Sequence, residues 1–364
     1  DVDGVMASAI MKLTFDALKI PSTVRLPKRF SEGYGLRREI VDEFAAGEFL
    51  ITVDNGIAAI DAVKAAKEKG MEVLVTDHHL AAVDEVTKQN IYPAADLIID
   101  PNAIPNSADF NGYCGAGLAY RLCYLLLNYR RKQEHWLVPK LKSLAAIATI
   151  ADSVPLTWEN RRIVREGLKT MVERGGTTKG LFALLCALEV QKYVSEDIVG
   201  FKIAPTINAP GRLRDDGAMD VFNLMVFNGP YAEAKVMAEK LLADNETRKE
   251  LSGIWAQIAK DKINEYGMEK DFPIVLYLPG IPEGIIGIIA GRIAEEYKTP
   301  CFLLGDAVDI SCLKGSGRSY GDVHLKKLLD QNQEYLVKYG GHAPAAGLTG
   351  KRDKLQEFRT ALQT

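Results

Sequence analysis

The chain has 364 residues, of which 47% are hydrophobic and 26% are charged, and its formal net charge is −3. This length predicts two domains, and the absence of any apolar run of about 18 residues excludes a transmembrane helix. The small net charge gives no sign of a broadly basic nucleic-acid-binding surface. The five cysteines are scattered and never spaced C-x-x-C. We therefore expect reduced thiols in a cytoplasmic protein and no zinc knuckle.

The chain opens on Asp1-Val2-Asp3-Gly4, which is followed by a helical pattern over residues 5–18. Two carboxylates, a glycine and a helix are typical of a site at the end of a strand, but no strand precedes them. We therefore expect a fragment of a longer protein. Residues 22–26 predict a strand. The loop after it contains Arg29 and two glycines, a composition equally typical of a solvated turn.

Two predicted strands and the helix between them form the centre of the pattern. Residues 49–53 run into Asp54, residues 57–69 have helical periodicity, and the strand at 73–75 runs into Asp77-His78-His79. Such strands are parallel, and ligands bind at the carboxyl ends of parallel strands. We therefore expect these side chains at one sheet edge, where oxygen and imidazole ligands suit Mn, Fe, Zn or Mg. Taken alone, Asp54 is more typical of a turn former or cap, and the metal-site interpretation rests on the recurrence of the pattern.

Two further apolar elements also end in an aspartate. Residues 95–99 predict a strand ending at Asp100, and residues 142–151 are an apolar element ending at Asp152. By itself Asp152 is typical of a cap, but beside Asp54 and the histidines it is a candidate metal ligand. Small residues at 112–117 open a predicted helix that runs to residue 129. We interpret them as close helix packing rather than as an anion site.

Basic and glycine-rich segments follow. Residues 160–174 predict a helix with a basic side, and the prolines at 203–213 predict a stiff loop that presents Arg212. A long helix is predicted over residues 231–266, where we place the connection between domains. The second domain is expected to have strands at 274–278 and 301–304, and helices at 284–297 and 322–329. Its loop at 315–319 has the composition of a phosphate nest, and residues 340–347 hold His342 among glycines.

The ordered motifs resemble a known superfamily. The four that resemble the metal motifs of the DHH phosphoesterases are Asp1-Val2-Asp3-Gly4, Val53-Asp54-Asn55-Gly56, Asp77-His78-His79 and Ile150-Ala151-Asp152. Gly340-Gly341-His342 resembles the signature of the DHHA1 domain. Within the superfamily the chain is most similar to the RecJ family of single-strand-specific exonucleases, through stretches such as Glu32–Leu36, Asn208–Leu213 and Ser316–Ser319.

The resemblance implies an α/β fold with two α/β domains. A parallel-sheet DHH domain would occupy residues 1–225, a long connecting helix residues 226–268, and a smaller DHHA1 domain residues 269–364. Two Mn²⁺ or Mg²⁺ ions are implied, and the implied metal ligands are Asp1, Asp3, Asp54, His78, His79 and Asp152. Asp77 would complete the catalytic centre with the two histidines, by orienting them or by joining the ligands. Substrate phosphates would contact Arg29, Arg212, Ser316, Arg318 and His342.

The implied activity is removal of 5′-mononucleotides from the 5′ end of single-stranded DNA in repair and recombination. A monomer is expected, with no membrane association, and with a single-strand-binding protein or helicase as candidate partner. Two alternatives remain. One is a DHH enzyme acting on short RNA, 3′-phosphoadenosine phosphate or a cyclic dinucleotide, and the other is a non-catalytic replication scaffold.

Two departures from the family pattern affect these expectations. Residues 281–284 replace a Trp-His pair of the family, so a substrate contact there is expected to differ. The family's additional oligonucleotide-binding fold is not found after residue 364. Because the strand before Asp1 is missing and Asp1 carries a terminal amine, we expect a weak metal site and reduced activity in this chain.

Overall fold

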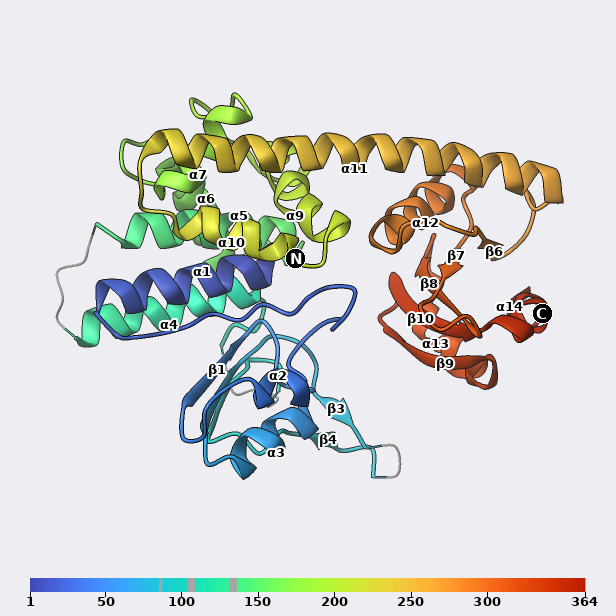
Figure 1. Ribbon diagram of the computed structural model, residues 1–364, viewed down its shortest axis with the longest axis horizontal. Helices are drawn as coiled ribbons and strands as arrows, with labels where there is room; N and C mark the ends of the chain where they lie inside the picture. Colours follow the sequence, from blue (N-terminus) through green and yellow to red (C-terminus); the bar gives the residue numbers. More distant parts are fainter. Residues whose placement is uncertain (85–86, 104–108, 131–135, 364) are drawn as a thin grey trace. The chain divides into compact units, whose positions relative to one another are not determined.

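The computed structural model describes residues 1–84, 87–103, 109–130 and 136–363 (Figure 1). The chain divides into two compact units, residues 1–245 and residues 246–364. The boundary lies within the long helix α11 (Tyr231–Tyr266), and each unit has hydrophobic cores of its own. Within the described ranges, no helix combines the length and the apolar character of a membrane-spanning segment.

A three-stranded parallel sheet carries the first unit's strand-end motifs. Its order is β1 (Phe49–Val53), β2 (Glu72–Thr76) and β5 (Leu97–Ile99). Helix α3 (Ile60–Glu68) makes the crossover from β1 to β2, and its apolar face packs with α2 (Arg38–Asp42) on the buried valines of β2. The predicted parallel sheet is therefore confirmed. β3 (Ala82–Val83) and β4 (Asn90–Ile91) form a separate antiparallel pair.

Helices make up the rest of the first unit. α1 (Val2–Ala17) packs against α4 (Gly115–Tyr129) and α5 (Val138–Ala151), and α5 also packs against α6 (Trp158–Val172) (Figure 1). Because α5 is enclosed in this way, it is apolar on most of its surface, with Leu141, Leu144 and Ile147 fully buried. The other elements of this unit are α7 (Lys179–Ala187), α8 (Glu196–Ile198), the π-helix η1 (Val199–Ile203), α9 (Ala204–Leu213) and α10 (Gly217–Val226).

The second unit is a five-stranded sheet covered by helices on both faces. The strand order is β6 (Ile274–Tyr277), β7 (Cys301–Asp306), β8 (Cys312–Arg318), β10 (Ala345–Lys351) and β9 (Leu336–Gly341), with only the β6–β7 pair parallel. Side chains alternate between the faces. Leu303 packs toward α12 (Glu283–Tyr297), and Phe302 packs toward α13 (Leu325–Gln331) and α14 (Leu355–Gln363). The short 3-10 helices are η2 (Gln333–Tyr335) and η3 (Arg352–Lys354).

The prediction of a strand at residues 22–26 is wrong, because this segment does not pair with any other described strand by hydrogen bonds. Val24 and Leu26 are partly buried against the helical core, while Arg25 binds Glu32 and Glu43 at 2.6 and 2.7 Å. Apolar residues at alternate positions, Val24 and Leu26, produced the strand-like pattern, although no neighbouring strand of the described ranges pairs with the segment.

The loop predicted at residues 203–213 is also wrong, because the segment forms helix α9. Pro205 lies in the first turn, where backbone N–H groups need no intrahelical acceptor, and Pro210 is tolerated inside the helix. Arg212 is therefore presented from a last helical turn, where its backbone is held more firmly than in a loop.

The loop predicted at residues 315–319 is wrong as well, because residues 315–318 complete strand β8. Its glycines make room for neighbours. A Cβ on Gly317 would lie 2.6 Å from a ring carbon of Phe302, and one on Gly315 would lie 2.9 Å from the carbonyl oxygen of Leu303. Close packing therefore explains the small residues that suggested a phosphate nest.

Candidate metal centre

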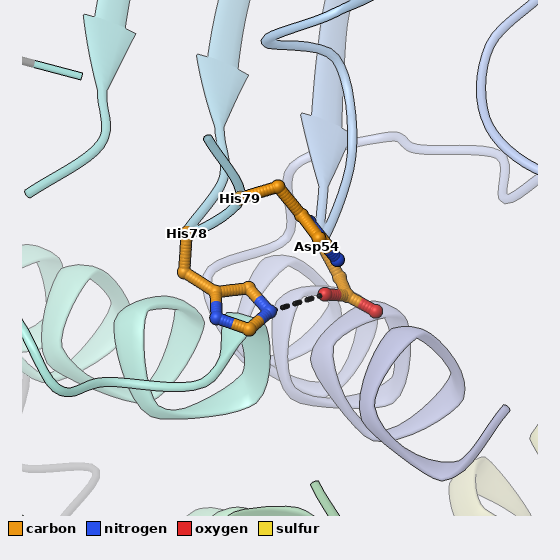
Figure 2. A group of neighbouring side chains, drawn as sticks. All are labelled: Asp54, His78 and His79. Atoms are coloured by element: carbon orange, nitrogen blue, oxygen red, sulfur yellow. Dashed lines mark ion pairs between the residues drawn. The ribbon is translucent and has the colours of Figure 1, made fainter. Parts of the chain in front are cut away.

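The acidic and imidazole side chains gather where β1 and β2 end. The register pairs Val53 with Thr76, so Asp54 and Asp77 are the next residues on neighbouring parallel strands. Asp54 has φ +59°, a left-handed conformation that turns the chain out of the strand. His78 points its Nε2 atom toward Asp54 Oδ1 at 3.2 Å (Figure 2). The strand ends therefore meet as the sequence predicts.

Asp3 from α1 and Asp152 from the end of α5 lie in the same cluster. His78 Nε2 lies 3.6 Å from Asp3 Oδ2 and 3.8 Å from Asp152 Oδ2. Among the described residues, two sets of three could hold a metal ion, Asp54–His78–His79 and Asp3–His78–Asp152, with ligand atoms within 4.8 Å of one another. Because His78 belongs to both sets, it stands at the centre of the cluster.

Asp1 lies at the edge of the cluster and belongs to neither set. Its carboxylate accepts a hydrogen bond from the Gly4 N–H at 3.1 Å and caps α1. A Cβ on Gly4 would lie 3.1 Å from Asp54 Oδ2 and 3.7 Å from Asp1 Oδ1, so both carboxylates approach the same glycine. The exposed Asp1 therefore has a capping role in this arrangement and remains near the metal ligands.

Asp77 is buried and makes four hydrogen bonds. Its Oδ2 accepts from the Ile57 N–H at 2.9 Å, and its Oδ1 accepts from the N–H groups of His78 and His79. The same Oδ1 lies 2.7 Å from His79 Nδ1, which leaves the other ring nitrogen of His79 for a ligand. These contacts fit an orienting role for Asp77 better than direct metal ligation.

Asp3 connects α1 to the start of α4. Its carboxylate accepts hydrogen bonds from the N–H groups of Gly115 at 2.6 Å and Ala116 at 2.7 Å. The packing interpretation of residues 112–117 was therefore incomplete, since this helix N-terminus does bind an anion, and the anion is Asp3. Close packing also applies, because a Cβ on Gly115 would lie 2.5 Å from the Asp54 Cβ.

The cluster concentrates negative charge that the protein alone does not neutralise. Burial, followed by the charge of Asp3, raises the pKa of Asp54 well above its ordinary value and that of Asp152 to about 6. Asp152 also follows the C-terminus of α5, where the helix dipole disfavours an anion. Burial acts in the same direction on Asp77, but hydrogen bonds from His79 and Ile57 hold its pKa below the ordinary value. The bond to Asp77 raises the pKa of His79.

These observations fit a bound divalent cation. Carboxylate and imidazole ligands together suit Mn, Fe, Zn or Mg, and a cation among them would remove the repulsion that raises the carboxyl pKa values. The glycines at positions 4 and 115 leave the space that the converging carboxylates need. The residues present therefore match the donor set and the charge that a metal centre requires.

Two residues of the third strand end were missed by the sequence analysis. Asn102 Nδ2 donates to the His78 carbonyl at 2.6 Å, and Asp100 Oδ1 accepts from the N–H groups of Asn102 and Ala103. Burial raises the pKa of Asp100 to about 6. The sequence feature that could have indicated these two residues is the Asp-Pro-Asn turn directly after the third parallel strand.

The first unit contains two of the predicted phosphate-binding residues, Arg29 and Arg212. Both guanidinium groups lie close enough to the Asp1 amine to act on it electrostatically. The loop of Arg29 is fixed by Asp215, whose carboxylate accepts from the Phe30 N–H at 2.7 Å and the Ser31 hydroxyl at 2.6 Å. Arg29 also lies over the ring of Tyr34. The structure therefore places both arginines within electrostatic range of Asp1.

The second unit contains the other three, Ser316, Arg318 and His342. Arg318 Nη1 donates to Ser316 Oγ at 2.7 Å, and both side chains project from the same face of β8. His342 begins the turn after β9, and its N–H donates to the carbonyl of Ala345, which is paired with Arg318 in the sheet. These three residues therefore share one end of the strands β8, β10 and β9.

Comparisons with known proteins agree with this arrangement. Residues 1–149 match the DHH family, N-terminal domain, and residues 271–364 match the DHHA1 domain. The chain is 34% identical to "Single-stranded-DNA-specific exonuclease RecJ" of Salmonella typhimurium over 379 residues, covering 99% of this chain and 63% of that protein. It therefore spans less than two thirds of the length of this curated relative.

Two solved structures are similar over the whole chain. The crystal structure of exonuclease RecJ bound to manganese has a TM-score of 0.81 and 30% identity, covering 100% of this chain and 87% of that one. The crystal structure of RecJ in complex with Mn²⁺ from Thermus thermophilus has a TM-score of 0.83 and 28% identity, covering 100% and 50%.

Proposed function

The chain belongs to the RecJ family, in which a DHH domain precedes a DHHA1 domain, and we therefore propose that it hydrolyses phosphodiester bonds in single-stranded DNA. Cleavage proceeds from the 5′ end and releases 5′-mononucleotides, in DNA repair and recombination. The observation that carries the proposal is the meeting of Asp3, Asp54, His78, His79 and Asp152 in two ligand sets that share His78.

Two Mn²⁺ or Mg²⁺ ions are the cofactors of this proposal, held by those five residues with Asp1 as a sixth ligand. When bound, they supply positive charge that stabilises the transferred phosphoryl group and lower the pKa of an attacking water. The protein fixes the ligands in place. Asp77 holds His79, Asn102 holds the backbone of His78, and the N-terminus of α4 holds Asp3.

The arginines are assigned to the phosphates of the substrate. Guanidinium groups bind phosphate through paired hydrogen bonds, and Arg29 and Arg212 both lie within electrostatic range of Asp1. Arg29 is the candidate contact for the 5′ end, which would set the direction of cleavage. In the second unit, Ser316, Arg318 and His342 offer a hydroxyl, a cation and an imidazole to a neighbouring phosphate.

Several wider features belong to the same proposal. The division into residues 1–225, 226–268 and 269–364 is retained, with α11 as the connecting helix. A cytoplasmic location is supported by five cysteines that are free thiols. The substrate partner is single-stranded DNA, delivered by a single-strand-binding protein or a helicase to a monomeric enzyme.

The test is Mn²⁺-dependent digestion of a 3′-labelled, 5′-phosphorylated single-stranded DNA, beside its duplex and a three-nucleotide RNA. Asp54→Ala and His78→Ala remove metal ligands, and Asp61→Ala removes an exposed carboxylate of α3 as a matched control. We expect stepwise shortening of the single strand from its 5′ end, lost in both ligand variants and retained in Asp61→Ala.

Other outcomes would contradict the proposal. Cleavage of the short RNA alone would assign the chain to the branch that acts on small substrates. Equal activity of the ligand variants and the wild type would remove the metal cluster from the mechanism. Mn²⁺ binding without cleavage of any of the three substrates would favour a non-catalytic role.

A further inference from the structure

The outer face of α6 combines one exposed aromatic side chain with a row of cations. Residues of a helix are about 100° apart, so these side chains fall within an arc of about 100°. The row consists of Trp158, Arg161, Arg162, Arg165 and Lys169, all exposed. Apolar residues such as Ile163, Val164 and Leu168 occupy the buried side. From Trp158 to Lys169 the row extends about 16 Å along the helix axis.

The positive charge of this face is only partly neutralised. Glu159 and Glu166 lie on its flank and pair with Arg162 at 3.7 and 4.0 Å, and Glu159 also pairs with Arg121 at 3.4 Å. In the described part of the chain, neither Arg161 nor Arg165 takes part in an ion pair. Two guanidinium groups on one face are therefore left to attract an external anion.

Trp158 is held in an unusual conformation at the end of this face that is nearest the metal centre. It is 82% exposed and has φ +44°, a left-handed value that a bulky residue rarely adopts. Such outliers persist where surrounding contacts impose them, and they cluster at functional sites. Two residues further on, Asn160 is fully buried, and its Nδ2 donates to the carbonyls of Pro155 and Gly112, which ties the start of α6 to the preceding loop.

This face begins close to the metal ligands. Trp158 lies six positions after Asp152 in the chain, so their Cα atoms are at most about 22 Å apart. The Gly112 carbonyl that anchors Asn160 belongs to the segment that leads into α4, whose first N–H groups hold Asp3. The same short loops therefore fix both the metal ligands and the start of the α6 face.

We propose that the α6 face binds single-stranded nucleic acid beside the metal centre, with Trp158 stacked on a base and Arg161 and Arg165 on phosphates. Aromatic stacking and a basic track are the two components of sequence-tolerant single-strand binding. The inference rests on the proposed function, since it assigns a binding surface to the strand that the metal centre cuts.

The test is binding of a 5′-phosphorylated oligo(dT) of twenty nucleotides, by fluorescence anisotropy over a range of salt concentrations. EDTA is present, so that the result does not depend on hydrolysis. Trp158→Gly removes the ring, and glycine accepts the left-handed backbone, so folding is preserved. Arg161→Ala/Arg165→Ala removes the two unpaired cations. Trp136→Ala and Arg130→Ala/Lys192→Ala remove another exposed tryptophan and two other exposed cations of the first unit as controls.

Loss of stacking in Trp158→Gly should weaken binding about 5- to 100-fold without changing its salt dependence. The double arginine variant should reduce the slope of log K against log[salt] by about 1.4, because each phosphate contact in a single strand contributes about 0.7. The control variants should bind like the wild type.

Wild-type affinity and salt slope in both α6 variants would overturn this inference and leave the proposed function intact. The same unchanged DNA binding is expected if the α6 face binds a protein partner instead of a nucleic acid. A wild-type protein that neither binds nor cleaves the single strand would overturn both proposals.

Discussion

At the scale of single residues, the metal centre depends on side chains that hold the ligands as well as on the ligands themselves. Asp77 is the clearest case, because it is buried and both of its oxygens are occupied by donors from the protein. Such partners fix the orientation of a metal-binding imidazole. The DHH motif therefore contains two candidate ligands, His78 and His79, and Asp77 is placed to position them.

Replacement of Asp77 by asparagine should weaken Mn²⁺ binding about 10- to 100-fold, because the amide cannot accept from both the Ile57 N–H and the His79 ring. Isothermal titration of the metal measures the effect, and Asp61→Asn is the exposed control. Unchanged affinity in Asp77→Asn would show that His79 is oriented by other contacts.

The raised pKa of Asp152 predicts a specific pH dependence of stability in the metal-free protein. A carboxyl group whose folded pKa is raised, here from 3.8 to about 6, stabilises the fold at low pH. This contribution is lost as the pH rises through the folded value. In the Asp152→Asn variant the side chain cannot ionise, so the variant does not lose this contribution to folding stability as the pH rises. Its stability relative to the wild type should therefore increase by about 1 kcal/mol between pH 4 and pH 8, a figure that allows for solvent screening.

Urea denaturation at several pH values in EDTA measures this difference, with Asp61→Asn as control. A stability difference that does not change with pH would contradict the prediction. With saturating Mn²⁺ the wild type should be more stable than Asp152→Asn, since only the wild type has this carboxylate as a proposed metal ligand.

At the scale of elements, small residues decide how closely strands and helices approach. Gly115 allows α4 to approach Asp54, and Gly317 allows Phe302 to pack on β8. At Gly115 composition already indicated close packing, whereas at Gly317 it suggested a phosphate-binding loop. The sequence shows that a residue is small, but it does not show which neighbour needs the space.

Substitution of Gly317 by alanine should destabilise the second unit by about 1–3 kcal/mol, because the new methyl group would overlap the Phe302 ring at 2.6 Å. Gly347→Ala is the matched control, since this glycine of the adjacent strand β10 has nothing within 4 Å of its added Cβ. Thermal unfolding measures both variants. Equal melting temperatures for the two would contradict the packing argument.

At the scale of the whole molecule, the proposed metal ligands all belong to the first unit, while each unit has its own cores. A ligand that binds only one unit should stabilise that unit alone. We therefore expect two calorimetric unfolding transitions. At a concentration of 100 times Kd, Mn²⁺ should increase the free energy of unfolding of the first unit by about 2.7 kcal/mol, and it should raise the temperature of that transition alone.

Asp54→Ala should abolish this shift without changing the other transition. An equal rise of both transition temperatures with Mn²⁺ would contradict this prediction, because it would show that the two units unfold as one.

The local features of this protein follow from its amino-acid sequence alone. The bounds of β1 and α11 match the predicted residues, and the parallel β1–α3–β2 unit was predicted from periodicity, because burial on one face imposes a regular repeat. The same topology placed Asp54 beside Asp77 and His78 at one sheet edge, since parallel strands end together.

Which distant segments complete the cluster depends instead on tertiary packing. Asp3 and Asp152 reach His78 through the packing of α1 and α5, and Asn102 reaches it from the third strand end. The same applies to residues 22–26, 203–213 and 315–319, where local composition suggested the wrong element. In each case the structure of the segment depends on contacts with residues far away in the chain. The local sequence does not show which residues these are.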